Sequence, residues 1–365
     1  MTATEPVAPA ARAGGFHRLR VAEVERLCAD AVAVTFEVPE RLRERFAFRP
    51  GQYLTLRLFR DGVEERRSYS ICAPAGAAPR VGVRRIESGL FSAWLVDDVR
   101  AGDEVEVGPP AGSFTPCALR TPAHHGLVAA GSGITPVLSI ATSALAAHPD
   151  TRVTLLYGNR RADTVMFTEE LSDLKNRYGP RLHLLHVLSR EPMEAEIFAG
   201  RLDGAKLREL LTRLVDVPSV DHWWLCGPLG MTESALAVLD ELGVDRSWVH
   251  RELFYVDEPP PELHHPDADP VTDETSEVTV VQGGRTTTLT LPRAVPVLDA
   301  AQRVRGDLPF ACKGGVCGTC RARVTAGEVR MRRNFALEAD ELAAGYVLTC
   351  QSLPAADKVT VDYDT

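Results

Sequence analysis

Residues 126–148 read GLVAAGSGITPVLSIATSALAAH, and this stretch decides the fold of the middle of the chain. An apolar run ends in Gly131 and Gly133, and a helical pattern follows with Pro136 near its first turn. Strands that alternate with helices predict a parallel sheet covered on both faces. The same alternation continues in three later apolar runs, with helical stretches between them: VTLLYGNR (153–160), LHLLHVLSR (182–190) and HWWLCGP (222–228).

The run GSGITP, from Gly131 to Pro136, places glycines at the carboxyl end of a strand and beside a helix N-terminus. It differs from the GxGxxG fingerprint. It nevertheless offers a phosphate the same free backbone N–H groups and the same helix dipole. We therefore predict that this turn binds the phosphates of a nicotinamide dinucleotide.

Other strands of this sheet end in residues that suit the same ligand. Cys226-Gly227-Pro228 closes one strand, so Cys226 either lies beside the nicotinamide or is a small buried hydrophobe. Arg160-Arg161 and Ser189-Arg190 close two others, and a guanidinium binds phosphate through two parallel hydrogen bonds. These pairs either bind the 2′-phosphate of NADPH or are solvated strand ends. We expect NADPH.

Residues 16–119 read differently, as short runs of alternating apolar and polar residues broken by Gly and Pro, which predicts a small antiparallel barrel. Within it, Arg67-Ser68-Tyr69-Ser70 combines a cation, a flat aromatic ring and hydroxyls, the groups that a flavin needs. Gly89-Leu90-Phe91-Ser92 opens a helix whose first N–H groups suit a pyrophosphate. Each motif alone also fits an ordinary strand or a Ser N-cap.

The run CKGGVCGTC contains Cys312, Cys317 and Cys320, and Cys350 follows after a gap of 29 residues. This is the C-x4-C-x2-C…C spacing of a plant-type [2Fe–2S] cluster. The glycines between the cysteines leave backbone N–H groups free to point at the sulfurs. The alternatives are a zinc knuckle or disulfides. Zinc sites prefer paired C-x2-C units, and nothing in the sequence indicates secretion. We therefore predict a centre that transfers single electrons.

Composition limits the partners. The chain has 365 residues, of which 45% are hydrophobic and 25% charged, as in a soluble globular protein. No apolar run is long enough to span a membrane and the N-terminus lacks a signal pattern, so we expect a cytoplasmic protein without a membrane partner. Residues 257–276 carry seven acids and no base, which is −7 of the net charge of −9. The rest is nearly neutral, which argues against a nucleic-acid partner.

The order of these motifs resembles the ferredoxin–NADP reductase superfamily, in its version with a C-terminal plant-type ferredoxin domain. The resemblance implies that Arg67 binds flavin phosphate, Tyr69 stacks on the isoalloxazine ring and Ser70 approaches its N5. It also implies that Gly89 and Ser92 bind the flavin pyrophosphate. The cofactor-binding set further includes Ser68, Phe91, Gly131, Gly133, Thr135, Pro136, Arg160, Ser189, Arg190, Cys226, Gly227 and Pro228.

The same resemblance assigns roles near the reacting atoms and divides the chain. Cys226 lines the path between nicotinamide and flavin, and Glu252 and Phe254 match the end of the reductase module, where an aromatic ring covers the flavin. FAD rather than FMN is implied by the resemblance alone. The expected parts are a disordered tail (1–15), an FAD-binding barrel (16–119), an NAD(P)-binding α/β domain (120–256), an acidic Pro-rich linker (257–276) and a β-grasp [2Fe–2S] ferredoxin domain (277–365).

Longer stretches, including LYGNR, MFTEELSDLKNRYGPRLHLLHVLSRE and CKGGVCGTCRARVTAGEV, are similar to the reductase subunits of phenylacetyl-CoA epoxidases. Two segments depart from that group. Arg332-Arg333 stands where an acid is usual, and ESGLFS stands where a double glycine is usual. The resemblance implies electron flow from NADPH through FAD and the cluster to a di-iron epoxidase that docks near the ferredoxin domain. The alternatives are a reductase for a steroid hydroxylase or Rieske oxygenase, a redox-sensing module, and a carrier that has lost its flavin.

Overall fold

The computed structural model describes residues 15–60, 63–87, 89–117, 119, 121–255 and 274–365. The predicted tail and most of the predicted linker lie outside these ranges. The chain divides into two compact units, one spanning Phe16–Pro260 and the other including Pro261–Thr365. We describe each unit by itself. No helix in the described part of the chain is long and apolar enough to cross a membrane.

The first half of the larger unit is the predicted antiparallel barrel. Its sheet has the strand order β4-β3-β6-β1-β2-β5, and an Ile71–Val81 bridge joins the end of β4 to β5. Alternate residues such as Leu54 and Leu56 are fully buried, so one face of each strand fills the interior. The elements are β1 (His17–Cys28), β2 (Ala31–Glu37), β3 (Tyr53–Arg60), β4 (Val63–Ser70), β5 (Arg80–Arg84), β6 (Glu104–Val107) and the helix α1 (Leu90–Ala93), which continues as a π-helical turn (Trp94–Asp98).

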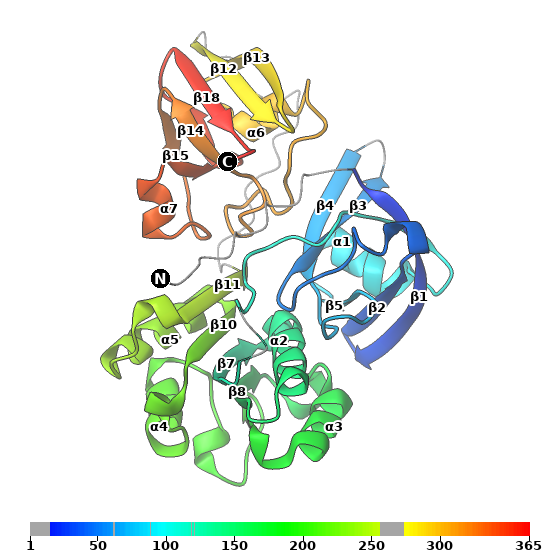
Figure 1. The fold of residues 1–365 in the computed structure, drawn as a ribbon, viewed down its shortest axis with the longest axis vertical. Coiled ribbons are helices and arrows are strands. Elements are labelled where there is room, and N and C mark those ends of the chain that lie inside the picture. Colours follow the sequence, from blue (N-terminus) through cyan, green and yellow to red (C-terminus); the bar gives the residue numbers. More distant parts are fainter. Residues whose placement is uncertain (1–14, 61–62, 88, 118, 120, 256–273) are drawn as a thin grey trace. The chain divides into compact units, whose positions relative to one another are not determined.

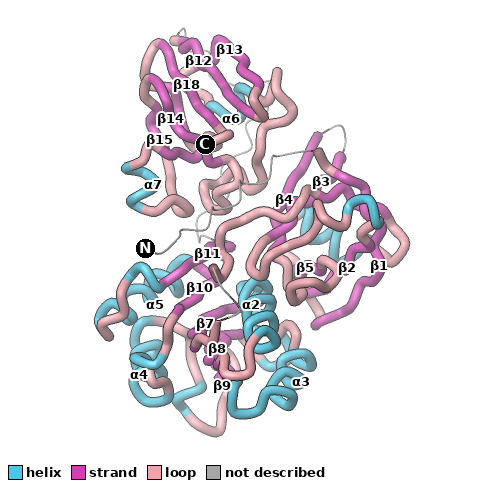
Figure 2. Tube along the Cα trace, in the orientation of Figure 1, coloured by secondary structure: helices cyan, strands magenta, loops and turns pink. Residues whose placement is uncertain are grey.

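The second half is the predicted parallel sheet, with the strand order β11-β10-β7-β8-β9. Helices α2 and α3 pack on one face, and α4 and α5 pack on the other (Figure 1; helices are cyan in Figure 2). The strands are β7 (His124–Ala130), β8 (Arg152–Asn159), β9 (Leu182–Leu188), β10 (His222–Pro228) and β11 (Val249–Tyr255). The helices are α2 (Ile134–Ala147), α3 (Thr168–Tyr178), α4 (Gly204–Leu214) and α5 (Leu229–Glu241).

Specific contacts join the barrel to the α/β domain. Arg80 of β5 pairs with Glu170 of α3 at 2.9 Å, and the Ser139 hydroxyl of α2 donates to the Ala73 carbonyl at 2.6 Å. Gly82 lies so close to α2 that a Cβ there would meet Thr135 Cγ2 at 2.6 Å. The two halves therefore pack tightly, as a site shared between them requires.

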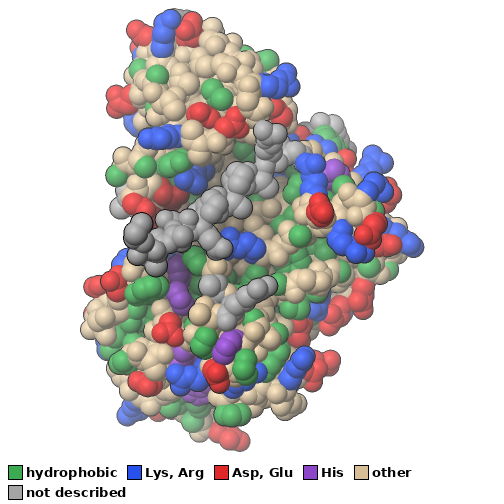
Figure 3. All heavy atoms as spheres, in the orientation of Figure 1, with side chains coloured by type: hydrophobic (Ala, Val, Ile, Leu, Met, Phe, Trp, Pro, Cys, Tyr) green, Lys and Arg blue, Asp and Glu red, His purple; other side chains and the backbone are tan. Residues whose placement is uncertain are grey.

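Neutral imidazoles stack across three strands of the parallel sheet. His125 of β7 stacks on His222 of β10 with ring centroids 5.7 Å apart, and His222 stacks on His250 of β11 at 6.0 Å. Trp224 stacks on His250 at 4.1 Å and donates its indole N–H to His125 Nδ1. Burial, reinforced by the neighbouring His222, lowers the pKa of His125 and of His250 to about 4. Histidine side chains also reach the surface of this domain, where Figure 3 draws them in purple.

We expect this stack to make the protein acid-sensitive. The unfolded chain binds a proton at each imidazole below pH 6.5, whereas folded His125 resists protonation down to about pH 4, so stability is lost as the pH falls between these values. For His125 that difference corresponds to about 3 kcal/mol at the acid limit. Thermal melting of His125→Phe should fall less between pH 7 and pH 4.5 than that of the wild type. His148→Gln, outside the stack, should follow the wild type. Equal slopes in all three proteins would contradict the prediction.

The smaller unit is a β-grasp with the strand order β13-β12-β18-β14-β16, in which β12 and β18 are parallel. β12 and β13 form an antiparallel hairpin, and β12 begins at Thr275, inside the segment predicted as linker. Its alternating burial pattern starts there, so sheet pairing overrides the acidic composition. The elements are β12 (Thr275–Gln282), β13 (Arg285–Pro292), α6 (Val297–Ala301), β14 (Arg321–Ala326), β15 (Val329–Met331), α7 (Ala339–Ala343), β16 (Tyr346–Leu348), β17 (Ser352–Pro354) and β18 (Lys358–Asp362).

Candidate functional site

The glycine turn lies where the order of the parallel strands reverses. β7 is central in the sheet, between β10 and β8, and its carboxyl end runs through Gly131–Gly133 into α2. Gly131 adopts a φ of +54°, which favours glycine, and a Cβ on Gly133 would lie 2.2 Å from the Cys226 carbonyl oxygen. Ligands of open α/β sheets bind at such a reversal point. The turn and the helix N-terminus therefore sit where a dinucleotide phosphate is expected.

The residues of this turn differ in how far their side chains are exposed to solvent. Thr135 and Pro136 are fully enclosed, Gly133 is buried, and the Thr135 hydroxyl donates to the Ser132 carbonyl at 3.0 Å. In this structure the Thr135 side chain closes the turn from inside, and its contact with a dinucleotide phosphate stays a prediction. Gly131 and Ser132 are half-buried and remain within reach of a ligand. Sequence reasoning passed over Ser132.

Two further polar residues missed by the sequence analysis lie beside the turn. Arg84, at the end of barrel strand β5, has a guanidinium nitrogen 3.9 Å from the Cβ position of Gly131. Asn159, the last residue of β8, is 7% exposed, and neither amide atom has a hydrogen-bond partner among the described residues. Burial raises the pKa of Tyr157 and the nearby Arg84 acts against this rise, while the Tyr157 hydroxyl donates to the Gly131 carbonyl at 3.0 Å. Arg84 adds positive charge where phosphate is expected.

The structure brings together the residues predicted to hold the 2′-phosphate. The Ser189 N–H donates to the Asn159 carbonyl at 2.9 Å, and the Arg190 N–H donates to the Arg160 carbonyl at 2.8 Å. Arg160, Ser189 and Arg190 are all exposed, while Arg161 pairs with Asp163 at 3.1 Å. Arg160 and Arg190 thus lie side by side at one sheet edge. Their role toward NADPH stays a prediction.

Ser70, Cys226 and Glu252 converge where the barrel meets the parallel sheet. The Ser70 hydroxyl donates to Glu252 Oε2 at 3.1 Å, and Cys226 is the register partner of Glu252 on the neighbouring strand. Burial raises the pKa of Glu252 to about 8, while the Ser70 hydrogen bond acts against this rise. Burial, and then the nearby Glu252, raises the pKa of the Cys226 thiol well above its usual value. Near pH 7, Glu252 is therefore protonated and Cys226 is a neutral thiol.

Aromatic rings lie beside this cluster on both modules. Tyr69, the penultimate residue of β4, lies 6.1 Å from the Phe91 ring of α1 at an interplanar angle of 39°, and Phe91 meets Trp94 edge-on at 5.4 Å. Burial raises the pKa of Tyr69 far above the neutral range. Phe254 lies two residues after Glu252 and packs on the core cluster that contains Cys226. These rings are of the type that stacks against a flavin.

The other predicted flavin-binding side chains have partners within the protein. Ser68 Oγ lies 3.2 Å from Thr55 Oγ1, and Arg67 pairs with Glu65 at 3.0 Å. The Ser92 hydroxyl accepts the Ile86 N–H at 3.0 Å and donates to the Gly89 carbonyl at 3.2 Å. Ser92 is 3% exposed, so it stabilises the ESGLFS loop. Arg67 is 42% exposed, and its role as the cation for a flavin phosphate stays a prediction.

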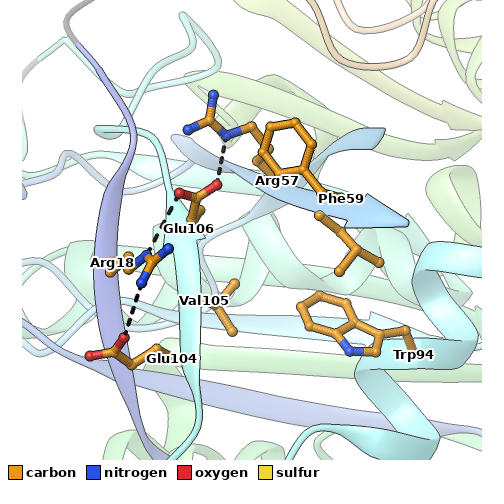
Figure 4. Close-up of a pocket in the computed structure, with 8 residues that line it drawn as sticks. Arg18, Arg57, Phe59, Trp94, Glu104, Val105 and Glu106 are labelled. Carbon is orange, nitrogen blue, oxygen red and sulfur yellow. Dashed lines mark hydrogen bonds and ion pairs between the residues drawn. The ribbon is translucent and has the colours of Figure 1, made fainter. Parts of the chain in front are cut away.

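A cavity of about 280 Å³ lies on the outer surface of the barrel, between β1, β3 and β6 and the Trp94 turn (Figure 4). Its charged groups are paired with one another: Arg57 lies 2.9 Å from Glu106, and Arg18 lies 4.0 Å from Glu104. The charged groups of the lining are therefore paired, and of the residues described above only Trp94 contributes to it.

The four predicted cluster cysteines form two pairs. A hydrogen bond between Cys312 and Cys317 lowers the pKa of Cys312 to about 5, and a corresponding bond to Cys350 raises the pKa of Cys320. All four are free of disulfides. Two thiolate pairs suit the two irons of a [2Fe–2S] cluster.

The loop backbone is shaped around these sulfurs. Lys313, Gly315 and Gly318 all have positive φ, and the Gly314 and Cys317 N–H groups donate to Cys312 Sγ at 3.3 and 3.4 Å. A Cβ on Gly315 would lie 3.1 Å from Gln351 and 3.3 Å from the Arg333 carbonyl. The Gln351 amide donates to the Lys313 carbonyl at 2.8 Å. N–H groups directed at sulfur stabilise ligating thiolates, so the loop fits the cluster.

The barrel, the parallel sheet with its glycine turn and the paired cysteines define an NAD(P)H-dependent oxidoreductase that uses FAD and a [2Fe–2S] cluster. Family models match each part: an oxidoreductase FAD-binding domain over residues 18–115, an oxidoreductase NAD-binding domain over 127–236, and a 2Fe-2S iron-sulfur cluster binding domain over 280–355. The chain belongs to the ferredoxin–NADP reductase-type family of oxygenase reductase components.

Individual relatives align along nearly the whole chain. One subunit of the 1,2-phenylacetyl-CoA epoxidase of Escherichia coli K12 is 43% identical, with 96% of this chain and 98% of that protein aligned. The ferredoxin reductase component of the 3-ketosteroid-9-alpha-monooxygenase of Rhodococcus rhodochrous is 34% identical, with 94% and 96% aligned. The solved structure of phthalate dioxygenase reductase is 25% identical with a TM-score of 0.59, and 95% and 98% of the two chains are covered. The predicted fold class is confirmed.

Proposed function

We propose that this protein transfers electrons from NADPH through FAD and its [2Fe–2S] cluster to the di-iron oxygenase of a phenylacetyl-CoA 1,2-epoxidase in aerobic phenylacetate catabolism. One observation supports this electron path above the others. The same chain contains the Ser70–Glu252–Cys226 cluster and a loop with two cysteine pairs. The choice of oxygenase is supported by 43% identity over 96% of the chain to one subunit of such an epoxidase.

Each group of residues has a part in this proposal. The glycine turn and Arg84 bind the dinucleotide phosphates, and Arg160, Ser189 and Arg190 select NADPH over NADH. Tyr69 and Phe254 hold the flavin ring, and Arg67 binds its phosphate. FAD, when bound, accepts two electrons from NADPH and releases them singly to the cluster.

The acid–base state of the reacting region follows from its burial. Protonated Glu252 and the neutral Cys226 thiol leave no negative charge where electrons arrive at the flavin. The Ser70 hydroxyl donates a hydrogen bond to Glu252 and so holds the carboxyl group in place. We propose that the oxygenase docks near the ferredoxin domain. We also place the protein in the cytoplasm, since the cluster thiolates need a reducing compartment.

The test is anaerobic rapid mixing with NADPH, followed by addition of the oxygenase component of the epoxidase, oxygen and phenylacetyl-CoA. The flavin absorbance should bleach first, the reduced-cluster signal should follow, and epoxide should form. A bleached flavin without cluster reduction would overturn the electron path.

A second candidate partner is the oxygenase of a 3-ketosteroid 9α-monooxygenase. The sequence favours it less, at 36% identity to the reductase component from Mycobacterium tuberculosis. Normal cluster reduction with steroid hydroxylation but no epoxide would transfer the proposal to this partner.

A further inference from the structure

A segment carrying three arginines is bonded directly to the cluster loop. The Arg332 N–H donates to the Gln351 carbonyl at 2.8 Å, and the Phe335 N–H donates to the Gly315 carbonyl at 3.1 Å. Gln351 follows the ligand Cys350, and its amide nitrogen lies 3.8 Å from the Cys350 sulfur. We call Arg330, Arg332 and Arg333 the basic rim. The backbone bonds hold this rim beside the cysteine pairs.

The guanidinium groups of Arg330 and Arg332 are available to a partner. Both residues are exposed, and none of the hydrogen bonds or ion pairs found among the described residues uses either side chain. Their spacing of two residues, with half-buried Met331 between them, places both side chains on the solvent side of the segment.

Exposed Glu328 and Asp340 lie on or close to this segment, but neither is found in an ion pair with Arg330 or Arg332. Glu341 pairs with Arg321 at 3.2 Å, and Glu338 shares a capping box with Glu341 at the start of α7. Residues 274–365 contain eleven acids and eleven bases, so the domain as a whole has no net side-chain charge at pH 7. Figure 3 likewise shows both signs interspersed over the visible face of this domain. Arg330 and Arg332 are therefore two exposed cations beside the cluster loop that no ion pair among the described residues occupies.

The cluster is also most accessible at one of its cysteine pairs. Cys312 and Cys317 are half-buried, while Cys320 and Cys350 are 3% and 2% exposed. Between Cys312 and Cys317 lies Gly315, the residue whose carbonyl bonds the segment that carries the rim. A partner that approaches the accessible pair therefore meets arginine side chains. Arginine binds carboxylates through two parallel bonds and is enriched at interfaces.

We propose that the basic rim is the docking surface for the electron acceptor, and that it selects a partner whose electron-entry face is acidic. This inference rests on the proposed function, since it names the charge of the surface that the oxygenase presents. Carboxylates on that face would pair with Arg330 and Arg332 and bring the acceptor to the Cys312–Cys317 side.

The experiment uses the full chain with both cofactors, reduced anaerobically, and follows the electron paramagnetic resonance signal of the reduced cluster after rapid mixing. Two acceptors each take one electron from the cluster: ferricyanide, an anion, and cytochrome c, a basic protein. Arg332→Glu should slow cluster oxidation by ferricyanide roughly three- to tenfold and accelerate oxidation by cytochrome c by a similar factor. Opposite changes exclude a merely damaged loop, which would alter both rates in one direction.

Arg285→Glu is the matched control, because Arg285 is exposed on β13 at the far edge of the sheet from β14 and β16, which flank the ligand segments. It should change neither rate by more than about twofold, since exposed charges are screened over about 10 Å. If Arg285→Glu changed the two oxidation rates in the same direction and by the same factor as Arg332→Glu, the rim would not be the source of the effect.

Two further measurements distinguish docking of an electron acceptor from a contact of the rim within this same chain. NADPH-driven cluster reduction should be unchanged in Arg332→Glu. If that step alone slowed, the rim would instead engage an acidic part of this same chain, and the docking proposal would fail. With the oxygenase component of the epoxidase as acceptor, Arg332→Glu should reduce turnover and weaken its dependence on NaCl. Because the ferricyanide and cytochrome c rates do not depend on the identity of the oxygenase, they test the rim even if the epoxidase assignment is wrong.

Discussion

Replacing Gly133 by alanine should reduce NADPH-dependent flavin reduction on the order of a hundredfold. A Cβ at this position would lie 2.2 Å from the Cys226 carbonyl oxygen and 2.6 Å from its carbonyl carbon, both of which are backbone atoms of the neighbouring strand β10. Neither can rotate away, so the turn must move, and the phosphate-binding N–H groups move with it. Overpacking of this kind also costs about 1–3 kcal/mol of stability.

Stopped-flow reduction by NADPH measures the loss, and reduction by dithionite serves as the internal reference. Dithionite does not use the dinucleotide site, so it should still reduce both the flavin and the cluster. Gly230→Ala is the matched control, because a Cβ on this helical glycine of α5 would meet nothing within 4 Å. A near-normal NADPH rate in Gly133→Ala would show that the turn does not position the dinucleotide.

The sequence predicted this site because its parts are local. A strand, two glycines and a helix follow one another within 23 residues, and the parallel-sheet topology then places the turn at a reversal of strand order. The cluster loop is local in the same sense, since three of its four ligands fall within nine residues. Both predictions rest on residues close together in the sequence, so they do not depend on how distant segments pack.

Residues that reach the site only through tertiary packing could not be predicted from the sequence. Arg84 belongs to a barrel strand and reaches the glycine turn only because β5 packs against α2, where Gly82 allows close approach. Asn159 gave no signal, since an asparagine after an apolar strand usually marks a turn. The burial of Thr135 was likewise beyond the sequence, because it depends on how the first turn of α2 packs.

The pairing of Ser70 with Glu252 joins segments 182 residues apart, and the sequence supplied Glu252 only through a family resemblance. The geometry adds what the resemblance lacked, which is the protonation state. Burial raises the pKa of Glu252 to about 8, which favours the protonated carboxyl group near neutral pH. This state has a measurable consequence.

We expect NADPH-driven flavin reduction to fall above about pH 8, by roughly tenfold per pH unit once Glu252 is ionised. The raised pKa means that the neutral acid is present below pH 8 and is lost as the pH rises through that value. A carboxylate beside the flavin site then opposes the arrival of further negative charge. Glu252→Gln, which keeps a neutral group of the same shape, should retain the rate below pH 8 and show no decline above it.

Ser70→Ala should keep the decline in flavin-reduction rate that Glu252→Gln abolishes, but at a different pH. The Ser70 hydrogen bond lowers the pKa of Glu252, so its removal should raise that pKa and move the decline to higher pH. Glu104→Gln, an exposed barrel residue 4.0 Å from Arg18, should leave the profile of the wild type unchanged. Transient rates from pH 6 to 10 in the four proteins decide the matter. A decline that persists in Glu252→Gln, or that moves to lower pH in Ser70→Ala, would mean that another group controls it. The predicted shifts in both variants would instead identify Glu252 as the proton-holding residue beside the flavin.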